Sequence, residues 1–465
     1  MNTQPRGIYL LIATQMWERF SFYGMRTLLV LFMVQSMRMG AAEAIGIYAL
    51  FTTLVNLGGL IGGLLADRIW GLRRAVYIGG SLIGLGHVCL SLGTLSVSFF
   101  VGLGLIVVGS SLFGVNVKAL VGQLYGEGDP RREPGYMLFY AGINLGGFLA
   151  AVSCGLAAQW YGWPVGFGLA GIGMFIGLFV LFIYRHLLEG RGEPPAGISH
   201  SERGLCLSAL VFSLFLIVLL IKSHAIFLPF LPVIGLCVMG GGLYGLRGHE
   251  ARGKILLIGG LILPYMGFFI VEDLMGSSLM LFSQHRVDRS IAGWEIPSSA
   301  LIAVNPFLIV ALGPLMAILM ERGGVRIDKA SVIKMNSMAF LLLGLAFGVL
   351  CWGVQVSGDD RVPIAYVVVG FSLMAIGELF VAPTLYAYCS ASAPPAWKGR
   401  MMGLVVVGRS YASLFSGMLG KTVTLFEGEM MEFAGISVAA FALCVILLMV
   451  GFVFKKNIDK KQLYC

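Results

Sequence analysis

The feature that most constrains this chain is a succession of apolar stretches, each long enough to cross a membrane. A hydrocarbon core of about 30 Å is spanned by about 20 apolar residues in a helix. A window of that length finds fourteen segments in the 465 residues. They are 8–34, 44–66, 75–95, 98–125, 136–158, 164–186, 204–222, 226–246, 254–284, 300–320, 331–355, 362–388, 400–424 and 431–454. The pattern predicts an all-α membrane protein with fourteen transmembrane helices.

Composition indicates a chain that lies almost entirely in the membrane. Charged residues make up 12% of it, about half the share found in soluble proteins. The longest polar stretch, 185–203, leaves no room for a soluble domain. The eight cysteines form no close pair of the C-x-x-C kind, which argues against a metal or redox site. We therefore expect no cofactor, and we exclude a soluble enzyme, a disordered chain and a disulfide scaffold.

The positive charges predict the orientation of the chain. Placing the N-terminus in the cytoplasm puts 22 of the 32 lysines and arginines in inner loops or tails, as the positive-inside rule requires. Both termini are then cytoplasmic, and the net charge of +9 needs no nucleic-acid partner. The segments divide as six, two and six. We expect an N-terminal six-helix bundle over 1–190, a linker with two inserted helices over 191–250, and a C-terminal six-helix bundle over 251–465.

Eight ionisable residues fall within the predicted spans, where such groups are costly and usually functional. The acids are Glu18, Glu272, Asp273 and Glu378, and the bases are Arg19, Arg26, Lys118 and Arg409. Their charges sum to zero, which favours a shared polar cavity in which opposite charges pair. The alternative is a set of structural ion pairs that hold helices together.

The first predicted helix carries an unusual polar stripe. Within an arc of about 140° lie the side chains of six residues, namely Gln15, Glu18, Arg19, Phe22, Tyr23 and Arg26. Glu18 and Arg19 point about 100° apart, so we expect them to pair with other helices. A guanidinium suits a carboxylate ligand, and Glu378 on a late helix suits an ammonium group. This combination predicts a zwitterionic ligand such as an amino acid or a short peptide.

Seven segments, in the same order along nearly the whole chain, match the motifs of one family. Residues 15–26 (QMWERFSFYGMR) are similar to E-x-x-E-R-F-S-Y-Y-G-M-R, and the loop over 62–71 is similar to G-G-x-L-A-D-R-x-x-G. Further matches lie at 139–148, 276–279, 305–306, 377–380 and 399–403. These motifs resemble the proton-dependent oligopeptide transporter (POT) family of the major facilitator superfamily. Bacterial members share the division of helices into six, two and six.

The resemblance implies a major facilitator fold with a peptide site between two bundles and alternating access. It implies a monomer in the bacterial inner membrane, surrounded by lipid, that imports di- or tripeptides together with protons. A carrier of the same fold that acts as a facilitator, or that takes an amino-acid-like solute, is the alternative. An intramembrane enzyme is disfavoured because neither HExxH nor G-x-S-x-G is present. A transporter-like receptor and a purely structural membrane protein are disfavoured as well.

The resemblance also assigns roles to individual residues. Glu378 would bind the peptide amino group and Arg26 would lie near its carboxylate. Matching positions of the substrate site are Tyr23, Arg26, Asn56, Asn144, Asn305 and Glu378. Those of proton coupling are Glu18, Arg19, Lys118, Glu272 and Asp273, and those of gating are Asp67 and Arg68. Helix capping and simple loop charge are the alternative for the two gating residues.

The sequence departs from the family where proton coupling is expected. Gln15 stands in place of the first motif glutamate, and Gly114 in place of a lysine on the fourth helix. If only the glutamate or only the lysine had been replaced, the other charge would be left without a partner in a low dielectric. Lys118, one turn further on, either substitutes for the missing lysine or extends to the inner interface.

Two further departures concern Asn56, where the family has a tyrosine, and Arg409, which has no counterpart. Arg409 could pair with Asp273, Glu272 or Glu378, or bind the substrate. Because Gln15 cannot titrate, a coupled proton would have to be carried by Glu18, by Asp273 or Glu272, or by Glu378.

Overall fold

The computed structural model describes residues 4–92, 96–126, 129, 131–194, 200–233, 252–322, 329–392, 398–425 and 429–463. These parts are almost entirely helical, which confirms the predicted all-α class. Nine of the described helices are long and apolar enough to cross a membrane. The polar-striped first helix is not among those nine. The count of fourteen spans and the cytoplasmic termini stay predictions, and most of segment 226–246 lies outside the described residues.

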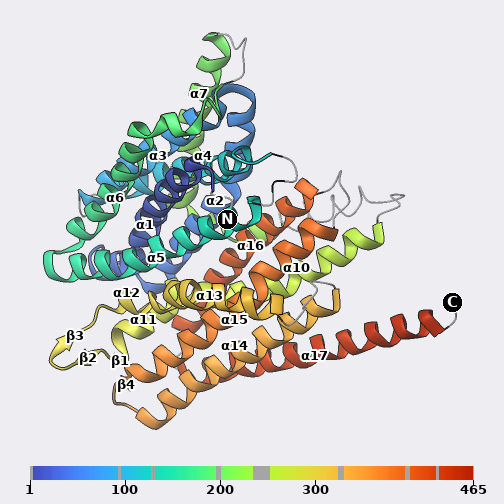
Figure 1. Cartoon of the computed structure of the whole chain (residues 1–465). Coiled ribbons are helices and arrows are strands. Elements are labelled where there is room, and N and C mark those ends of the chain that lie inside the picture. Colours follow the sequence, from blue (N-terminus) through green and yellow to red (C-terminus); the bar gives the residue numbers. More distant parts are fainter. Residues whose placement is uncertain are drawn as a thin grey trace. The chain divides into compact units, whose positions relative to one another are not determined.

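The chain forms two compact units (Figure 1). The first unit comprises Met1–Phe227 and Pro297–Phe307, and the second comprises Leu228–Ile296 and Leu308–Cys465. The helix over 200–222 thus groups with the first unit, where it packs on the helix over 96–123. The expected boundaries at 190 and 250 stay a prediction.

The first unit is built from helices in chain order. These are α1 (Arg6–Gln35), α2 (Ala41–Leu65), η1 (Ala66–Trp70), α3 (Gly71–Ser91), α4 (Ser96–Gln123), α5 (Arg132–Tyr161), α6 (Trp163–Ile183), η2 (Arg185–Leu188), α7 (His200–Lys222), α8 (His224–Phe227) and α12 (Ser298–Leu301). Helix α1 packs on α5 and α6, α3 on α4 and α6, and α2 on α4. This packing turns the polar stripe of α1 toward neighbouring helices.

The second unit combines long helices with short strands. Its elements are α10 (Arg252–Glu272), η3 (Asp273–Gly276), α11 (Ser278–His285), β1 (Val287–Asp288), β2 (Ser290–Ile291), β3 (Trp294–Glu295), most of α13 (Val304–Arg322), α14 (Lys329–Ser357), β4 (Val362–Pro363), α15 (Ile364–Ser392), α16 (Lys398–Leu425) and α17 (Glu429–Leu463). Strands β1 and β4 pair in parallel, and β2 and β3 form an antiparallel hairpin. Strands of two residues are too short to be predicted from sequence periodicity.

Close helix contacts in the first unit depend on glycine. A methyl group added at Gly62 on α2 would lie 1.9 Å from the backbone oxygen of Ser111 on α4. One added at Gly146 on α5 would lie 2.2 Å from the backbone oxygen of Met16 on α1. Small residues let transmembrane helices approach to backbone contact, and here they bring α2 close to α4 and α5 close to α1.

Two local features differ from the sequence interpretation. The expected loop over 62–71 is wrong, because α2 continues to Leu65 and a π-helical turn follows at Ala66–Trp70. The chain turns only at Gly71, whose φ of 71° favours glycine. The predicted span 254–284 is broken after Glu272 by η3 and by Ser277, whose φ of −133° and ψ of −98° are not helical. The apolar pattern continues through this break, so the window could not detect it.

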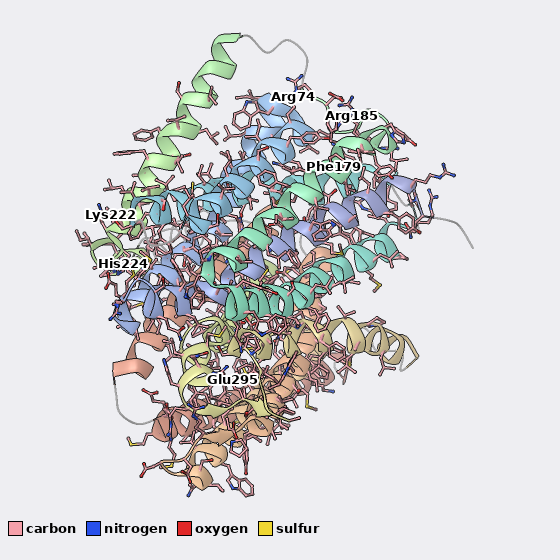
Figure 2. All side chains as sticks on the ribbon, turned by 90° about the vertical axis from the view of Figure 1, so that its left-hand side faces the viewer. Arg74, Phe179, Arg185, Lys222, His224 and Glu295 are labelled. Atoms are coloured by element: carbon pink, nitrogen blue, oxygen red, sulfur yellow. The ribbon has the colours of Figure 1, made fainter. Side chains whose placement is uncertain are left out.

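In the first unit, charged side chains lie at two ends and apolar side chains lie between them (Figure 2). Arg74 at the start of α3 and Arg185 after α6 lie at one end of the unit, and Lys222 at the end of α7 lies at the other. Between these ends Phe179 points outward from α6 with 64% of its surface exposed. An apolar belt between charged ends is typical of a protein that crosses a membrane.

Replacing Gly62 by alanine tests the contact between α2 and α4. We expect Gly62→Ala to lower stability by about 1–3 kcal/mol because the new methyl group overlaps the Ser111 backbone. Gly63→Ala is the matched control, since its methyl group meets nothing within 4 Å. Thermal unfolding in detergent measures both variants, and equal melting temperatures would contradict the packing argument.

Candidate functional site

The ionisable residues predicted within the spans form two polar clusters, one in each unit. In the first unit they gather around Glu18, which is completely buried. In the second unit they gather around Asp273, whose exposed fraction is 1%. In each of these clusters a buried carboxylate pairs with a guanidinium, as expected for opposite charges.

Glu18 is held by its own neighbours on α1. Arg19 donates from Nε at 2.6 Å and from Nη2 at 2.7 Å to the two carboxylate oxygens of Glu18. Gln15 donates its amide to the same carboxylate at 2.5 Å. The expectation that Glu18 and Arg19 pair with other helices is wrong. The arginine side chain is long enough to turn back on its neighbour, and a buried carboxylate gains most from such a two-point contact.

Lys118 on α4 adds a further positive charge to this first cluster. It interacts electrostatically with both Glu18 and Arg19, yet its side chain is exposed at the surface of the unit. One turn earlier, Gly114 faces open space, with nothing within 4 Å of an added methyl group. That Lys118 substitutes for the lysine missing at Gly114 stays a prediction.

Arg26 lies two turns beyond Arg19 on the same helix. It donates from Nε to the hydroxyl of Tyr48 on α2 at 2.6 Å. The ring of Tyr23 lies 6.0 Å from the Arg19 guanidinium and 5.9 Å from that of Arg26. A tyrosine of α2 thus contacts the cationic stripe from position 48, eight residues before Asn56.

The remaining residues predicted in the first unit occupy separate helices. Asn56 on α2 is half-buried. Asn144 on α5 donates to the backbone oxygen of Tyr140 at 3.0 Å, and Asn305 near the start of α13 is buried. The side chains of Asp67 and Arg68 lie outside the described residues, although their backbone belongs to the π-helical turn.

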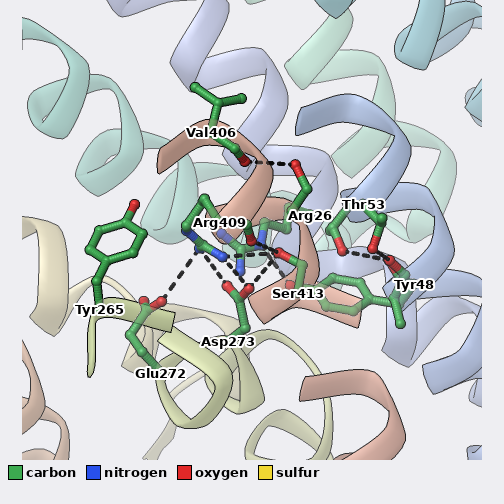
Figure 3. A network of polar contacts seen from close by, with 12 residues as sticks. Arg26, Tyr48, Thr53, Tyr265, Glu272, Asp273, Val406, Arg409 and Ser413 are labelled. Atoms are coloured by element: carbon green, nitrogen blue, oxygen red, sulfur yellow. Dashed lines mark hydrogen bonds and ion pairs between the residues drawn. The ribbon is translucent and has the colours of Figure 1, made fainter. Parts of the chain in front are cut away.

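Asp273 is the centre of the second cluster (Figure 3). Its two carboxylate oxygens accept from Arg409 on α16, at 2.5 Å from Nη1 and 2.7 Å from Nη2. The Ser413 hydroxyl, one turn further along α16, donates to the same carboxylate at 2.6 Å. Asp273 occupies the break after α10, so this contact fastens the broken helix to α16. Of the partners left open for Arg409, Asp273 is therefore its main one.

Glu272 and two tyrosines extend this second cluster. The Glu272 carboxylate lies 3.6 Å from Nη2 of Arg409. The hydroxyl of the buried Tyr265, about two turns before Glu272 on α10, lies 3.1 Å from the Tyr386 hydroxyl of α15. Both tyrosines interact electrostatically with Arg409 and with Glu378 on α15. Figure 3 shows Glu272 and Tyr265 on one side of Arg409 and Ser413 on the other.

Four polar contacts of these clusters were not predicted, namely Tyr48, Tyr265, Tyr386 and Ser413. Ser413 follows Arg409 by four residues, so helical spacing could have revealed it. The tyrosines carry no comparable signal in an apolar helix, where they read as packing residues. In the described part of the chain, no three histidine, cysteine, aspartate or glutamate side chains are grouped so as to hold a metal ion.

Comparison with known proteins assigns the chain to a family. The sequence profile described as the POT family matches residues 73–226 and 235–437. The chain belongs to the POT family. This confirms the resemblance drawn from the motifs and establishes a multi-pass membrane protein whose relatives are transporters.

Individual POT relatives match over nearly their whole length. The peptide transporter YePEPT of Yersinia enterocolitica is 30% identical, with 98% of this chain and 96% of the relative covered. A peptide transporter POT solved in complex with sulfate is 30% identical with a TM-score of 0.85, covering 96% and 94%. A POT family transporter solved with 5-aminolevulinic acid is 25% identical with a TM-score of 0.87, covering 96% of each chain.

The pair between Asp273 and Arg409 is expected to contribute strongly to stability. Removing one partner of a buried ion pair costs about 3–5 kcal/mol, so Arg409→Gln should markedly lower the melting temperature. The double variant Asp273→Asn with Arg409→Gln should recover most of the loss, because no charge of the pair is left alone.

Thermal unfolding in detergent, arranged as a double-mutant cycle, measures this coupling. Arg73→Gln is the control, since its partner Glu193 is 57% exposed and exposed pairs contribute about 0–1 kcal/mol. Additive losses in the double variant would show that the two residues do not stabilise each other.

Proposed function

We propose that the protein imports di- or tripeptides by proton symport with alternating access. The observation that carries the proposal is the division of charge between the units. Of the eight ionisable residues predicted within spans, the first unit holds Arg19, Arg26, Lys118 and Glu18, three bases against one acid, net +2. The second holds Glu272, Asp273, Glu378 and Arg409, three acids against one base, net −2. A zwitterion complements such a division, because its two ends carry opposite charges.

Two of the four acids take part in close ion pairs within their own units. Glu18 and Asp273 are each engaged by a guanidinium in a two-point contact. In our proposal Arg26 binds the peptide carboxylate, with Tyr23 beside it, and Glu378 binds the ammonium group. A guanidinium matches a carboxylate in geometry as well as in charge.

Asn56, Asn144 and Asn305 complete the proposed substrate site. Their amides both donate and accept hydrogen bonds, which suits the peptide groups of varied substrates. For opening and closing of the inner gate we propose Asp67 and Arg68. We further propose that the protein works as a monomer in the bacterial inner membrane.

The relatives support this cargo and also name the alternative. YePEPT is called a peptide transporter, and one structural neighbour was solved with 5-aminolevulinic acid. An amino-acid-like solute is therefore the second candidate. A facilitator is the other variant, because Gln15 cannot bind the proton that a glutamate would.

Uptake of labelled dialanine into liposomes tests the proposal. With an inward proton gradient we expect concentrative uptake that an uncoupler abolishes. Glu378→Gln should reduce uptake at least about tenfold, since losing a charged hydrogen bond of about 1.5–3 kcal/mol weakens binding by that order. Glu43→Gln, an exposed acid at the start of α2, is the control. Uptake that merely equilibrates would indicate a facilitator, and no uptake by folded protein would indicate another cargo.

Restoring the two family residues tests the coupling. We expect the double variant Gln15→Glu with Gly114→Lys to depend more steeply on the proton gradient than the natural chain. The open space at Gly114 leaves room for the lysine. Gradient-driven uptake at several pH values measures the dependence, and Gly114→Ala controls for the loss of glycine. An unchanged dependence would contradict a coupling role for these positions.

A further inference from the structure

Two tyrosine hydroxyls meet in the second unit, and the two residues differ in burial. The hydroxyl of Tyr265 on α10 lies 3.1 Å from that of Tyr386 on α15. Tyr265 is 1% exposed, whereas Tyr386 is 38% exposed. Among the described residues, neither hydroxyl has another hydrogen-bond partner. A phenolic hydroxyl both donates and accepts, so one proton of the pair is shared between the two oxygens and the other is left over.

The difference in burial decides which tyrosine donates. If Tyr386 donated to Tyr265, the leftover proton would lie on a buried oxygen without an acceptor, which costs free energy. If Tyr265 donates to Tyr386, the leftover proton lies on the exposed hydroxyl, where solvent or a ligand can accept it. The second arrangement is therefore the stable one. It leaves Tyr386 as a hydrogen-bond donor at the surface of the unit.

Tyr386 lies on the same helix as Glu378, which we assign to the substrate ammonium group. It follows Glu378 by eight residues on α15 and interacts with it electrostatically. Eight helical residues correspond to a rise of about 12 Å between the Cα atoms. Long side chains in a helix lean back toward its N-terminus, which brings the Tyr386 hydroxyl closer to Glu378. Two extended peptide residues span about 7 Å, so a ligand of that length reaches from one group to the other.

We propose that Tyr386 donates a hydrogen bond to the second peptide group of a tripeptide whose ammonium group is bound at Glu378. The inference rests on the proposed peptide transport and names the substrates for which Tyr386 matters. A tripeptide has a second peptide carbonyl about two residues from its ammonium group. A dipeptide has a single peptide group, next to the ammonium group, followed by the carboxylate that we assign to Arg26. Tyr386 therefore favours tripeptides over dipeptides.

Ring contacts hold the donor in place. The ring of Tyr265 lies edge-on to that of Tyr386, with the ring centres 6.2 Å apart. On its other side the Tyr265 ring lies 4.7 Å from the ring of Phe269, one turn further along α10. Aromatic pairs at such distances are attractive. Removing the Tyr265 hydroxyl keeps these ring contacts, so it leaves both the position of Tyr386 and its own hydroxyl intact.

Substituting single tyrosines by phenylalanine tests the proposal by uptake of labelled peptides into liposomes. We expect Tyr386→Phe to raise the KM for trialanine about fivefold, as the loss of one neutral hydrogen bond does, and to change the KM for dialanine less than about twofold. Tyr265→Phe should leave both KM values within about twofold of the natural chain, because the Tyr386 donor remains. Tyr411→Phe is the matched control, since the Tyr411 hydroxyl on α16 donates to the backbone oxygen of Leu231 at 3.1 Å.

A purely structural role of the tyrosine pair gives a different result. Tyr265→Phe and Tyr386→Phe remove the same hydrogen bond between α10 and α15, so a structural role would make the two variants alike for both peptides. Such equal changes would overturn the proposal. Thermal unfolding of the purified protein in detergent, with each peptide added, gives a readout that does not depend on transport. Trialanine should stabilise Tyr386→Phe less than the natural chain, and dialanine should stabilise both equally.

The outcomes separate this inference from the proposed function. If the natural chain takes up both peptides and Tyr386→Phe has the same KM for trialanine, the assignment of Tyr386 is wrong and peptide transport stands. If the natural chain takes up dialanine but not trialanine, the assignment is also wrong and transport of dipeptides stands. Uptake of neither peptide by the folded natural chain would overturn both proposals.

Discussion

The structure depends on neutralising charges that an apolar helix cannot leave alone. Glu18 is completely buried and Asp273 is 1% exposed. An isolated carboxylate in such a position costs several kcal/mol. Each acid instead accepts two hydrogen bonds from one guanidinium. The inward orientation of the polar stripe on α1 and the attachment of η3 to α16 both follow from this requirement.

The two units neutralise their buried carboxylates in different ways. Glu18 pairs with the next residue, so α1 continues as an uninterrupted helix to Gln35. Asp273 pairs with Arg409, 136 residues later, and lies where the helix is interrupted. The first arrangement needs only one helix, whereas the second ties two helices together. A conformational change that moves α10 relative to α16 therefore has to strain or break this pair.

The charges that remain distinguish the units chemically. Arg26 and Lys118 in the first unit exceed what Glu18 and Arg19 neutralise between themselves. In the second unit the excess is negative, at Glu272 and Glu378. The two close pairs provide stability, and we assign the substrate to other charged residues of the spans. In our proposal this division serves a zwitterionic substrate while Glu18 and Asp273 stay paired.

The sequence by itself determined that the chain is helical and membrane-spanning, which residues are polar within the spans, and which family they resemble. Those properties follow from composition, from segment length and from short motifs. Only the tertiary structure decided the partners: that Glu18 binds Arg19, that Arg409 binds Asp273, and that Tyr48 reaches Arg26. It also decided the break at η3 and the π-helical turn at Ala66–Trp70. Apolar periodicity is the same for a straight helix and a broken one. The direction in which Arg19 turns, and the distances between helices that bring Arg409 to Asp273 and Tyr48 to Arg26, are recorded in no local pattern.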